Sequence, residues 1–240
     1  MPALLAIFPH PDDEAFAVAG TLARCHREGI ATSLFTATDG EGGRITGMAV
    51  RDRADGARIR RRELLTAAGV LGVARVFTPG FPDGGLAGAD PEELSAHLVR
   101  VIREARPDVV LTFGPEGAPT GHPDHKALSR LATAAFFLAA NPTVHTAEGP
   151  VWRARRLYFH SWSGRIGRRG RGEGLEGTPV TCRIDISAVL QLKREAFAAH
   201  RSQRHHQPEF DALLEQVEEF HLAAGVAQTL ALTDDLFDGL

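Results

Sequence analysis

The sequence is poor in cysteine, poor in lysine and free of long apolar runs. Two cysteines in 240 residues cannot form a disulfide framework, and free buried thiols are typical of a reducing compartment. No apolar stretch reaches the roughly 20 residues that a membrane-spanning helix needs. The short apolar run at the N-terminus has no basic segment before it, so we expect no secretory signal. These absences predict a cytoplasmic protein without a membrane span.

A large excess of charge of one sign is also missing. The chain has 27 Lys and Arg against 30 Asp and Glu, a formal net charge of −3, which gives no general attraction to nucleic acid or to an acidic membrane. Hydrophobic residues make up 43% and charged residues 24%, as in ordinary globular proteins. A chain of this length fits one α/β domain, and we expect a single domain over residues 1–240.

Short apolar runs alternate with helical patterns along the chain. The run from Leu4 to Phe8 is typical of a strand buried on both faces. Further strands are expected over residues 31–38, 75–78, 108–113, 157–160 and 180–186, and helices over 14–27, 53–70, 90–105, from 122 onward, 187–200 and 208–227. This alternation predicts a Rossmann-like, mostly parallel sheet sandwiched between helices. Ligands of such sheets bind beyond the carboxyl ends of the strands.

A polar hexapeptide, Pro9-His10-Pro11-Asp12-Asp13-Glu14, directly follows the first expected strand. A dinucleotide-binding fold would have glycines here. The adjacent carboxylates repel one another, and a bound cation would relieve that repulsion. His10 and Asp13 are spaced to offer one nitrogen and one oxygen to a single ion. The alternative is that Asp12 and Asp13 only cap the next helix, since acidic residues are common caps.

A second histidine motif, His122-Pro123-Asp124-His125, follows the fourth expected strand. Pro123 at the first helical position places His122 at the N-cap and His125 at N3, on the edge of the sheet that carries His10. His10, Asp13 and His125 then form a three-ligand set with an open fourth position, the pattern of catalytic zinc sites. Iron(II) is an alternative, because ligand type alone does not decide the metal.

With these two motifs in this order, the sequence resembles the PIG-L/LmbE-like family of zinc-dependent N-acetylglucosaminyl deacetylases. Weaker similarities are Thr38-Asp39-Gly40-Glu41, Asp83-Gly84 and a late segment ending in His200-Arg201-Ser202-Gln203. The resemblance covers about residues 4 to 203. It implies the LmbE-like fold. It also implies that His10, Asp13 and His125 bind zinc, the same three residues as in the ligand set above.

The resemblance also implies roles for residues around the metal. Asp12 would be the general base, and His122 would stabilise the oxyanion of the tetrahedral intermediate. We expect Asp124, or another nearby carboxylate, to keep the His122 imidazole charged, and we therefore count Asp124 among the catalytic residues. Arg60 and Asp83 would bind the sugar.

The implied partner is a small molecule, an N-acetylated amino-sugar conjugate in which N-acetylglucosamine is joined to inositol, malate, a lipid or a glycopeptide. A place in the synthesis of a low-molecular-weight thiol, of the bacillithiol type, would suit such a substrate. Family members often form trimers or hexamers, which makes a homo-oligomer an expectation here. Nucleic acid is not expected as a partner.

Two rival functions remain open at this point. One keeps the metal site but hydrolyses another amide or an ester. The other is a non-catalytic nucleotide- or RNA-binding Rossmann protein that uses the arginine- and glycine-rich segment 165–174. We favour a mobile, solvated flap over the site for that segment.

Overall fold

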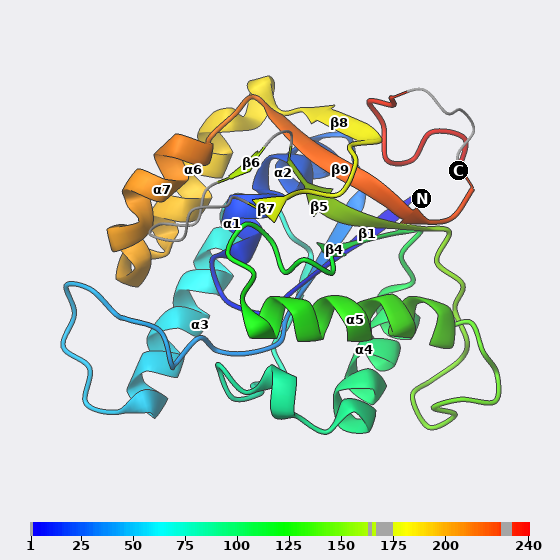
Figure 1. Cartoon of the computed structure of the whole chain (residues 1–240), viewed down its shortest axis with the longest axis horizontal. Coiled ribbons are helices and arrows are strands. Elements are labelled where there is room, and N and C mark those ends of the chain that lie inside the picture. The colour runs from blue at the N-terminus through cyan, green and yellow to red at the C-terminus, as the bar shows by residue number, and fades with distance from the viewer. Residues whose placement is uncertain (1, 163–164, 167–174, 227–231) are drawn as a thin grey trace.

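The computed structural model describes residues 2–162, 165–166, 175–226 and 232–240. Its centre is a seven-stranded sheet in the order β3-β2-β1-β4-β5-β9-β8 (Figure 1). The strands are β1 (Ala3–Phe8), β2 (Ala31–Thr36), β3 (Arg75–Phe77), β4 (Val109–Phe113), β5 (Arg156–Ser161), β8 (Cys182–Asp185) and β9 (Val217–Ala224), and a separate two-stranded sheet pairs β6 (Arg165–Ile166) with β7 (Leu175–Glu176).

The first five strands of the large sheet are parallel to one another, and the last two pairings, β5 with β9 and β9 with β8, are antiparallel. β1 pairs with β2 on one side and with β4 on the other, with Leu4 opposite both Thr32 and Val109. β9 runs antiparallel to β5, and β8 runs antiparallel to β9. The strand order changes direction between β1 and β4, so the carboxyl ends of these two strands form the crevice where such folds bind ligands. The Rossmann-like sheet predicted from the sequence is confirmed.

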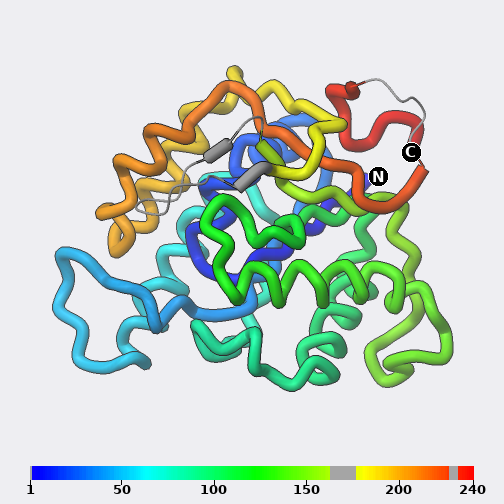
Figure 2. Tube along the Cα trace, viewed as in Figure 1, coloured from blue at the N-terminus to red at the C-terminus, as the bar shows by residue number. Residues whose placement is uncertain are grey.

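Helices cover both faces of this sheet. They are α1 (Asp13–Ala17), α2 (Ala19–Arg27), α3 (Arg53–Val70), α4 (Pro91–Ala105), α5 (Pro123–Leu138), α6 (Leu190–Ala199) and α7 (Gln207–Leu213), with 3-10 turns at Leu86–Gly88, Ser187–Val189 and Arg201–His206. Alternate residues of β1 face opposite layers: Phe8 packs with residues of α2, α3 and α6, whereas Ile7 packs with residues of α4 and α5. Figure 2 shows the same two layers along the Cα trace.

The expected helix over residues 208–227 is wrong. The chain forms α7 and then the strand β9, in which Glu218 and Phe220 are buried between less buried neighbours. The Glu218 carboxylate accepts hydrogen bonds from the amides of Gly20 and Thr21, at 2.9 and 2.8 Å, and pairs with Lys193 Nζ at 2.6 Å. Because these partners come from α2 and α6, local periodicity could not reveal that a glutamate belongs in the core.

Two smaller differences concern the first helix and the arginine-rich segment. The helix expected over residues 14–27 is interrupted at Val18, which separates α1 from α2. Of the segment 165–174, only the backbone of β6 is described, and residues 167–174 lie outside the described residues, so its expected role as a flap stays a prediction. Within the described residues, no helix is long and apolar enough to cross a membrane.

Candidate metal centre

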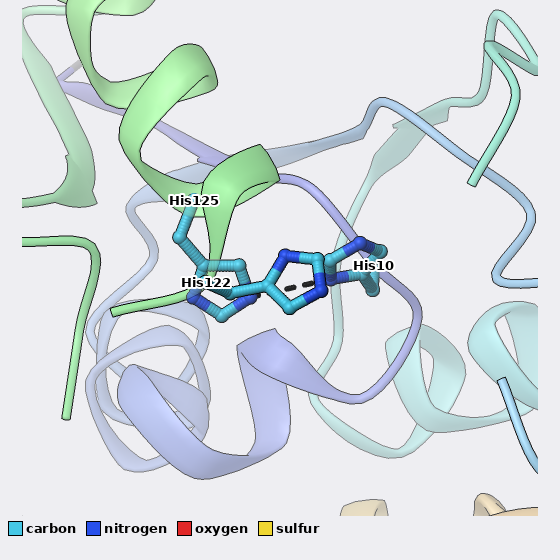
Figure 3. A group of neighbouring side chains, drawn as sticks. All are labelled: His10, His122 and His125. Atoms are coloured by element: carbon cyan, nitrogen blue, oxygen red, sulfur yellow. Dashed lines mark hydrogen bonds between the residues drawn. The ribbon is translucent and has the colours of Figure 1, made fainter. Parts of the chain in front are cut away.

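His10 lies two residues beyond β1, Asp13 begins α1, and His125 lies in the first turn of α5. The three side chains converge on one point at the carboxyl edge of the sheet, and Figure 3 shows the two histidine rings meeting there. His10 Nδ1 lies 3.2 Å from His125 Nε2 and 3.3 Å from Asp13 Oδ2, and His125 Nε2 lies 3.4 Å from Asp13 Oδ1. Two ligands of a tetrahedral zinc ion lie about 3.3–3.4 Å apart when each is 2.0–2.1 Å from the metal.

The second nitrogen of the His10 ring is held by carboxylates. Nε2 lies 3.1 Å from Asp83 Oδ1 and 3.2 Å from Asp124 Oδ2. A metal-binding histidine commonly donates its other ring N–H to a carboxylate, which fixes the tautomer and the ring orientation. The geometry therefore fits Nδ1 as the metal ligand of His10, with Asp83 and Asp124 as its orienting partners.

Electrostatics at this edge favour a cation. Burial lowers the pKa of His10, but hydrogen bonds to Asp124, Asp13 and Asp83 outweigh it and raise that pKa well above the ordinary value. Burial lowers the pKa of His125 to about 4, so this ring is neutral and its Nε2 lone pair is free to bind a metal. Three carboxylates around two imidazoles form a donor set that a divalent ion would neutralise.

Two other groups of side chains also bring possible ligand atoms within 4.8 Å of one another. One consists of His10, His122 and His125, and the other of His10, Asp83 and Asp124. The second is less suited to a metal, because its oxygens already accept backbone hydrogen bonds: Gly42 N donates to Asp83, and Gly84 N and Leu86 N donate to Asp124.

His122 occupies the N-cap of α5, as the sequence predicted, and its Nδ1 accepts a hydrogen bond from Asp124 N at 3.2 Å. Because Nδ1 is the acceptor, the ring proton is on Nε2. The ring lies beside His10, with 5.0 Å between ring centroids (Figure 3). His122 thus presents an N–H donor to the site.

The carboxylate of Asp124 makes its hydrogen bonds with groups other than His122. It is fully buried, accepts the two loop amides and bonds the His10 ring. Helix geometry explains this placement: a side chain at the second position of α5 lies over the preceding turn, which places it beside His10. The hydrogen bond between Asp124 and His122 goes through the Asp124 amide, and the expected role of the Asp124 carboxylate in keeping His122 charged stays a prediction.

Arg60 and Asp83, the two residues expected to bind the sugar, both contact other residues of the site. Arg60 is only 4% exposed, and its guanidinium donates to the carbonyls of Gly40 and Pro11 and pairs with Asp12 Oδ2 at 3.2 Å. Asp83 supports His10, and the His10 interaction and the Gly42 amide lower its pKa to about 2 against the effect of burial. These contacts hold Asp12 and His10, and the expected binding of the sugar by Arg60 and Asp83 stays a prediction.

Asp12 lies beside the three ligand candidates in an unusual backbone conformation. Its φ is 108°, in the left-handed region that a residue with a side chain rarely adopts, at a cost of order 1–3 kcal/mol. Burial raises the pKa of Asp12 to about 6, against the opposing effect of Arg60. A carboxylate tuned in this way can accept a proton near neutral pH.

Comparison with known proteins agrees with this geometry. The family model described as "PIG-L: GlcNAc-PI de-N-acetylase" matches residues 5–136. A 1D-myo-inositol 2-acetamido-2-deoxy-alpha-D-glucopyranoside deacetylase from Rhodococcus jostii is 36% identical, with 83% of this chain and 81% of that protein covered. The chain belongs to the PIG-L family of N-acetylglucosaminyl deacetylases.

Solved structures extend the similarity over nearly the whole chain. The conserved protein TT1542 from Thermus thermophilus is 30% identical, with a TM-score of 0.75 over 95% of this chain and 98% of that one. An N,N'-diacetylchitobiose deacetylase from Pyrococcus horikoshii has a TM-score of 0.76 over 98% and 88%, at 21% identity, and supports the fold alone. As a family member the protein is an N-deacetylase, a hydrolase of amide bonds, which confirms the resemblance stated from its motifs.

Two residues of the motifs, Glu14 and His200, have no role assigned from the sequence. Glu14 ends the first motif and His200 lies near the end of the late segment, and the structure joins them by a buried hydrogen bond of 2.6 Å. Because 186 residues separate them, no local pattern could pair them.

We expect His125→Ala to lower metal affinity by more than about 100-fold, beyond the usual effect of losing an outer-sphere partner. The alanine removes the ligand atom that α5 aims at Asp13. Metal content after dialysis against a buffered zinc solution measures the effect, and His205→Ala, at a ring bonded to Thr46 away from the site, is the control. Full metal content in the His125 variant would remove that residue from the ligand set.

Proposed function

We propose that the protein is a zinc hydrolase that removes the acetyl group from N-acetylglucosamine linked to an inositol. The observation that carries the chemistry is the convergence of His10, Asp13 and His125. His10 Nδ1 lies 3.2 Å from His125 Nε2, and the two carboxylate oxygens of Asp13 lie 3.3 Å from the first of these nitrogens and 3.4 Å from the second. The sugar and the inositol come from the relatives, several of which are named as deacetylases of 1D-myo-inositol 2-acetamido-2-deoxy-alpha-D-glucopyranoside.

The donor set of two imidazoles and one carboxylate suits zinc, and iron(II) would accept the same ligands. A divalent ion held there supplies Lewis acidity, which polarises the acetamide carbonyl and makes water easier to deprotonate. The buried Nδ1 of His125 has no partner among the described residues, so the ring is fixed mainly by stacking on Phe113, with 4.6 Å between ring centroids.

The remaining chemistry is proton transfer and charge stabilisation by the chain itself. Asp12 takes a proton from the attacking water as the water oxygen bonds to the carbonyl carbon. The Nε2–H of His122 donates to the oxygen that becomes negative in the tetrahedral intermediate. Asp12 then returns the proton to the amide nitrogen as the C–N bond breaks, which releases acetate and the free amine.

The substrate is a small N-acetylated amino-sugar conjugate, and the inositol attached to it is the finer part of this proposal. A role in low-molecular-weight thiol synthesis fits such a substrate, and the bacillithiol-type route stays a prediction. Assembly into trimers or hexamers and a cytoplasmic location also stay predictions.

Asp12→Asn should retain the metal but lower kcat by about 10²–10⁴-fold, the usual contribution of a general base. The amide keeps the size of the side chain and cannot accept the proton. Steady-state kinetics and metal analysis on the same preparation separate the two effects, with Asp211→Asn on α7 as the control. Loss of metal from the Asp12 variant would make this residue a ligand.

Acetate release from a panel of N-acetylated sugars tests the function itself. The panel contains N-acetylglucosamine alone and its conjugates with inositol, with malate and with a lipid, each with chelator, without it, and with zinc restored. We expect the highest kcat/KM for the inositol conjugate, complete loss with chelator and recovery with zinc. A preference for malate would overturn the proposed aglycone, and activity that survives complete metal removal would overturn the metal mechanism.

A further inference from the structure

The left-handed backbone at Asp12 needs interactions that hold it. Its carbonyl accepts hydrogen bonds from Ala15 N and Phe16 N, at 2.9 and 3.2 Å, which begin α1. Those two bonds fix the carbonyl side of the residue. The amide side is fixed by a side chain, because Asp12 N donates to Glu14 Oε2 at 3.0 Å.

Glu14 is fully buried and uses both of its oxygens. Oε2 accepts from the Asp12 amide, and Oε1 accepts from His200 Nε2 at 2.6 Å, with both side chains at 0% exposure. A buried carboxylate is costly unless it is paired and hydrogen-bonded. His200 therefore both compensates the burial of Glu14 and fixes the direction of its carboxylate.

His200 itself is anchored to another part of the fold. It follows α6, and its amide donates to Phe197 O at 3.0 Å. Two residues later, Ser202 donates from its amide and its hydroxyl to the buried Glu63 of α3, at 2.8 and 2.6 Å. The segment after α6 is thus fastened to α3, and its position does not depend on α1.

We propose that Glu14 and His200 are a pair of positioning residues that hold the strained backbone of Asp12, so that its carboxylate stays in line with the reacting water. This inference rests on the role proposed above for Asp12. Neither residue is placed against substrate or metal: His200 is 1% exposed and Glu14 is fully buried.

Arg60 fixes the same residue from the opposite side. Its guanidinium pairs with the Asp12 carboxylate and bonds the carbonyl of Pro11. With Arg60 on the side chain and Glu14 on the amide, Asp12 cannot rotate without breaking one of these buried contacts. Loss of the Glu14–His200 bond releases the amide side alone, which lets φ move toward the ordinary negative region while Asp13 remains in α1.

The experiment compares His200→Ala with the conservative His200→Gln, whose amide N–H reaches about as far as Nε2. Lys193→Met is the matched control. Lys193 lies on the same helix α6 and forms a similarly buried pair with Glu218, which bonds α2. Lys193 Nζ also donates to Phe16 O in α1, at 2.9 Å, but it bonds neither Asp12 nor Glu14. Each variant is measured for kcat, KM, metal content and melting temperature, and the His200→Ala enzyme is crystallised.

We expect His200→Ala to lower kcat by about 100-fold, the typical effect of a small misplacement of a catalytic group, with KM changed by less than about 3-fold and metal content unchanged. His200→Gln should recover most of kcat. Lys193→Met should lower the melting temperature and leave kcat within about 3-fold. In the His200→Ala crystal structure, Asp12 should leave its positive φ while His10, Asp13 and His125 stay in place.

A purely structural role for His200 would give the pattern of Lys193→Met, with lower stability, unchanged kcat and Asp12 still at positive φ, and would overturn the inference. If His200→Ala fails to fold, Glu14→Asp replaces it, because the shorter carboxylate cannot reach His200 and the Asp12 amide together. The crystal structure gives the backbone conformation of Asp12 in the absence of any substrate. An enzyme inactive on every acetylated sugar would therefore overturn the proposed function, and the crystal structure would still decide the positioning claim.

Discussion

The site depends on one imidazole held from both sides. His10 Nδ1 faces Asp13 and His125, and its Nε2 faces Asp83 and Asp124. These partners come from the segments that follow β1, β3 and β4, three strands whose carboxyl ends open on the same edge of the sheet. The parallel sheet brings the segments together, and the carboxylates on either side of His10 make the position suitable for a divalent cation.

Around that imidazole the fold uses buried charge to fix geometry. Arg60 and Glu14 hold Asp12, Glu63 holds the segment after α6, and Glu218 joins α2, α6 and β9. Each of these charged groups is buried and is hydrogen-bonded or ion-paired, which keeps the cost of desolvation low. The same arrangement explains why a strained residue persists at the point where a base is needed, since the surrounding contacts leave it no other conformation.

Much of the fold could be predicted from the sequence, because local signals were strong. The helix α3 occupies the expected residues 53–70, and the expected start of α4 is confirmed by Asp90, whose side chain accepts the Glu92 amide with Pro91 next to it. The convergence of the two histidine motifs also followed, since parallel strands end at one edge. Local signals could not predict which groups Asp124 and Arg60 bond, because only the folded chain brings those partners near them. A periodic pattern also misassigned β9, because burial of its glutamate depends on α2 and α6.

Anomalous diffraction at the zinc absorption edge, from crystals of the zinc-loaded protein, tests the central claim most directly. The account predicts one strong peak about 2.0–2.2 Å from His10 Nδ1, His125 Nε2 and an oxygen of Asp13. A peak between His10 Nε2, Asp83 and Asp124, or no peak at this edge of the sheet, would contradict it.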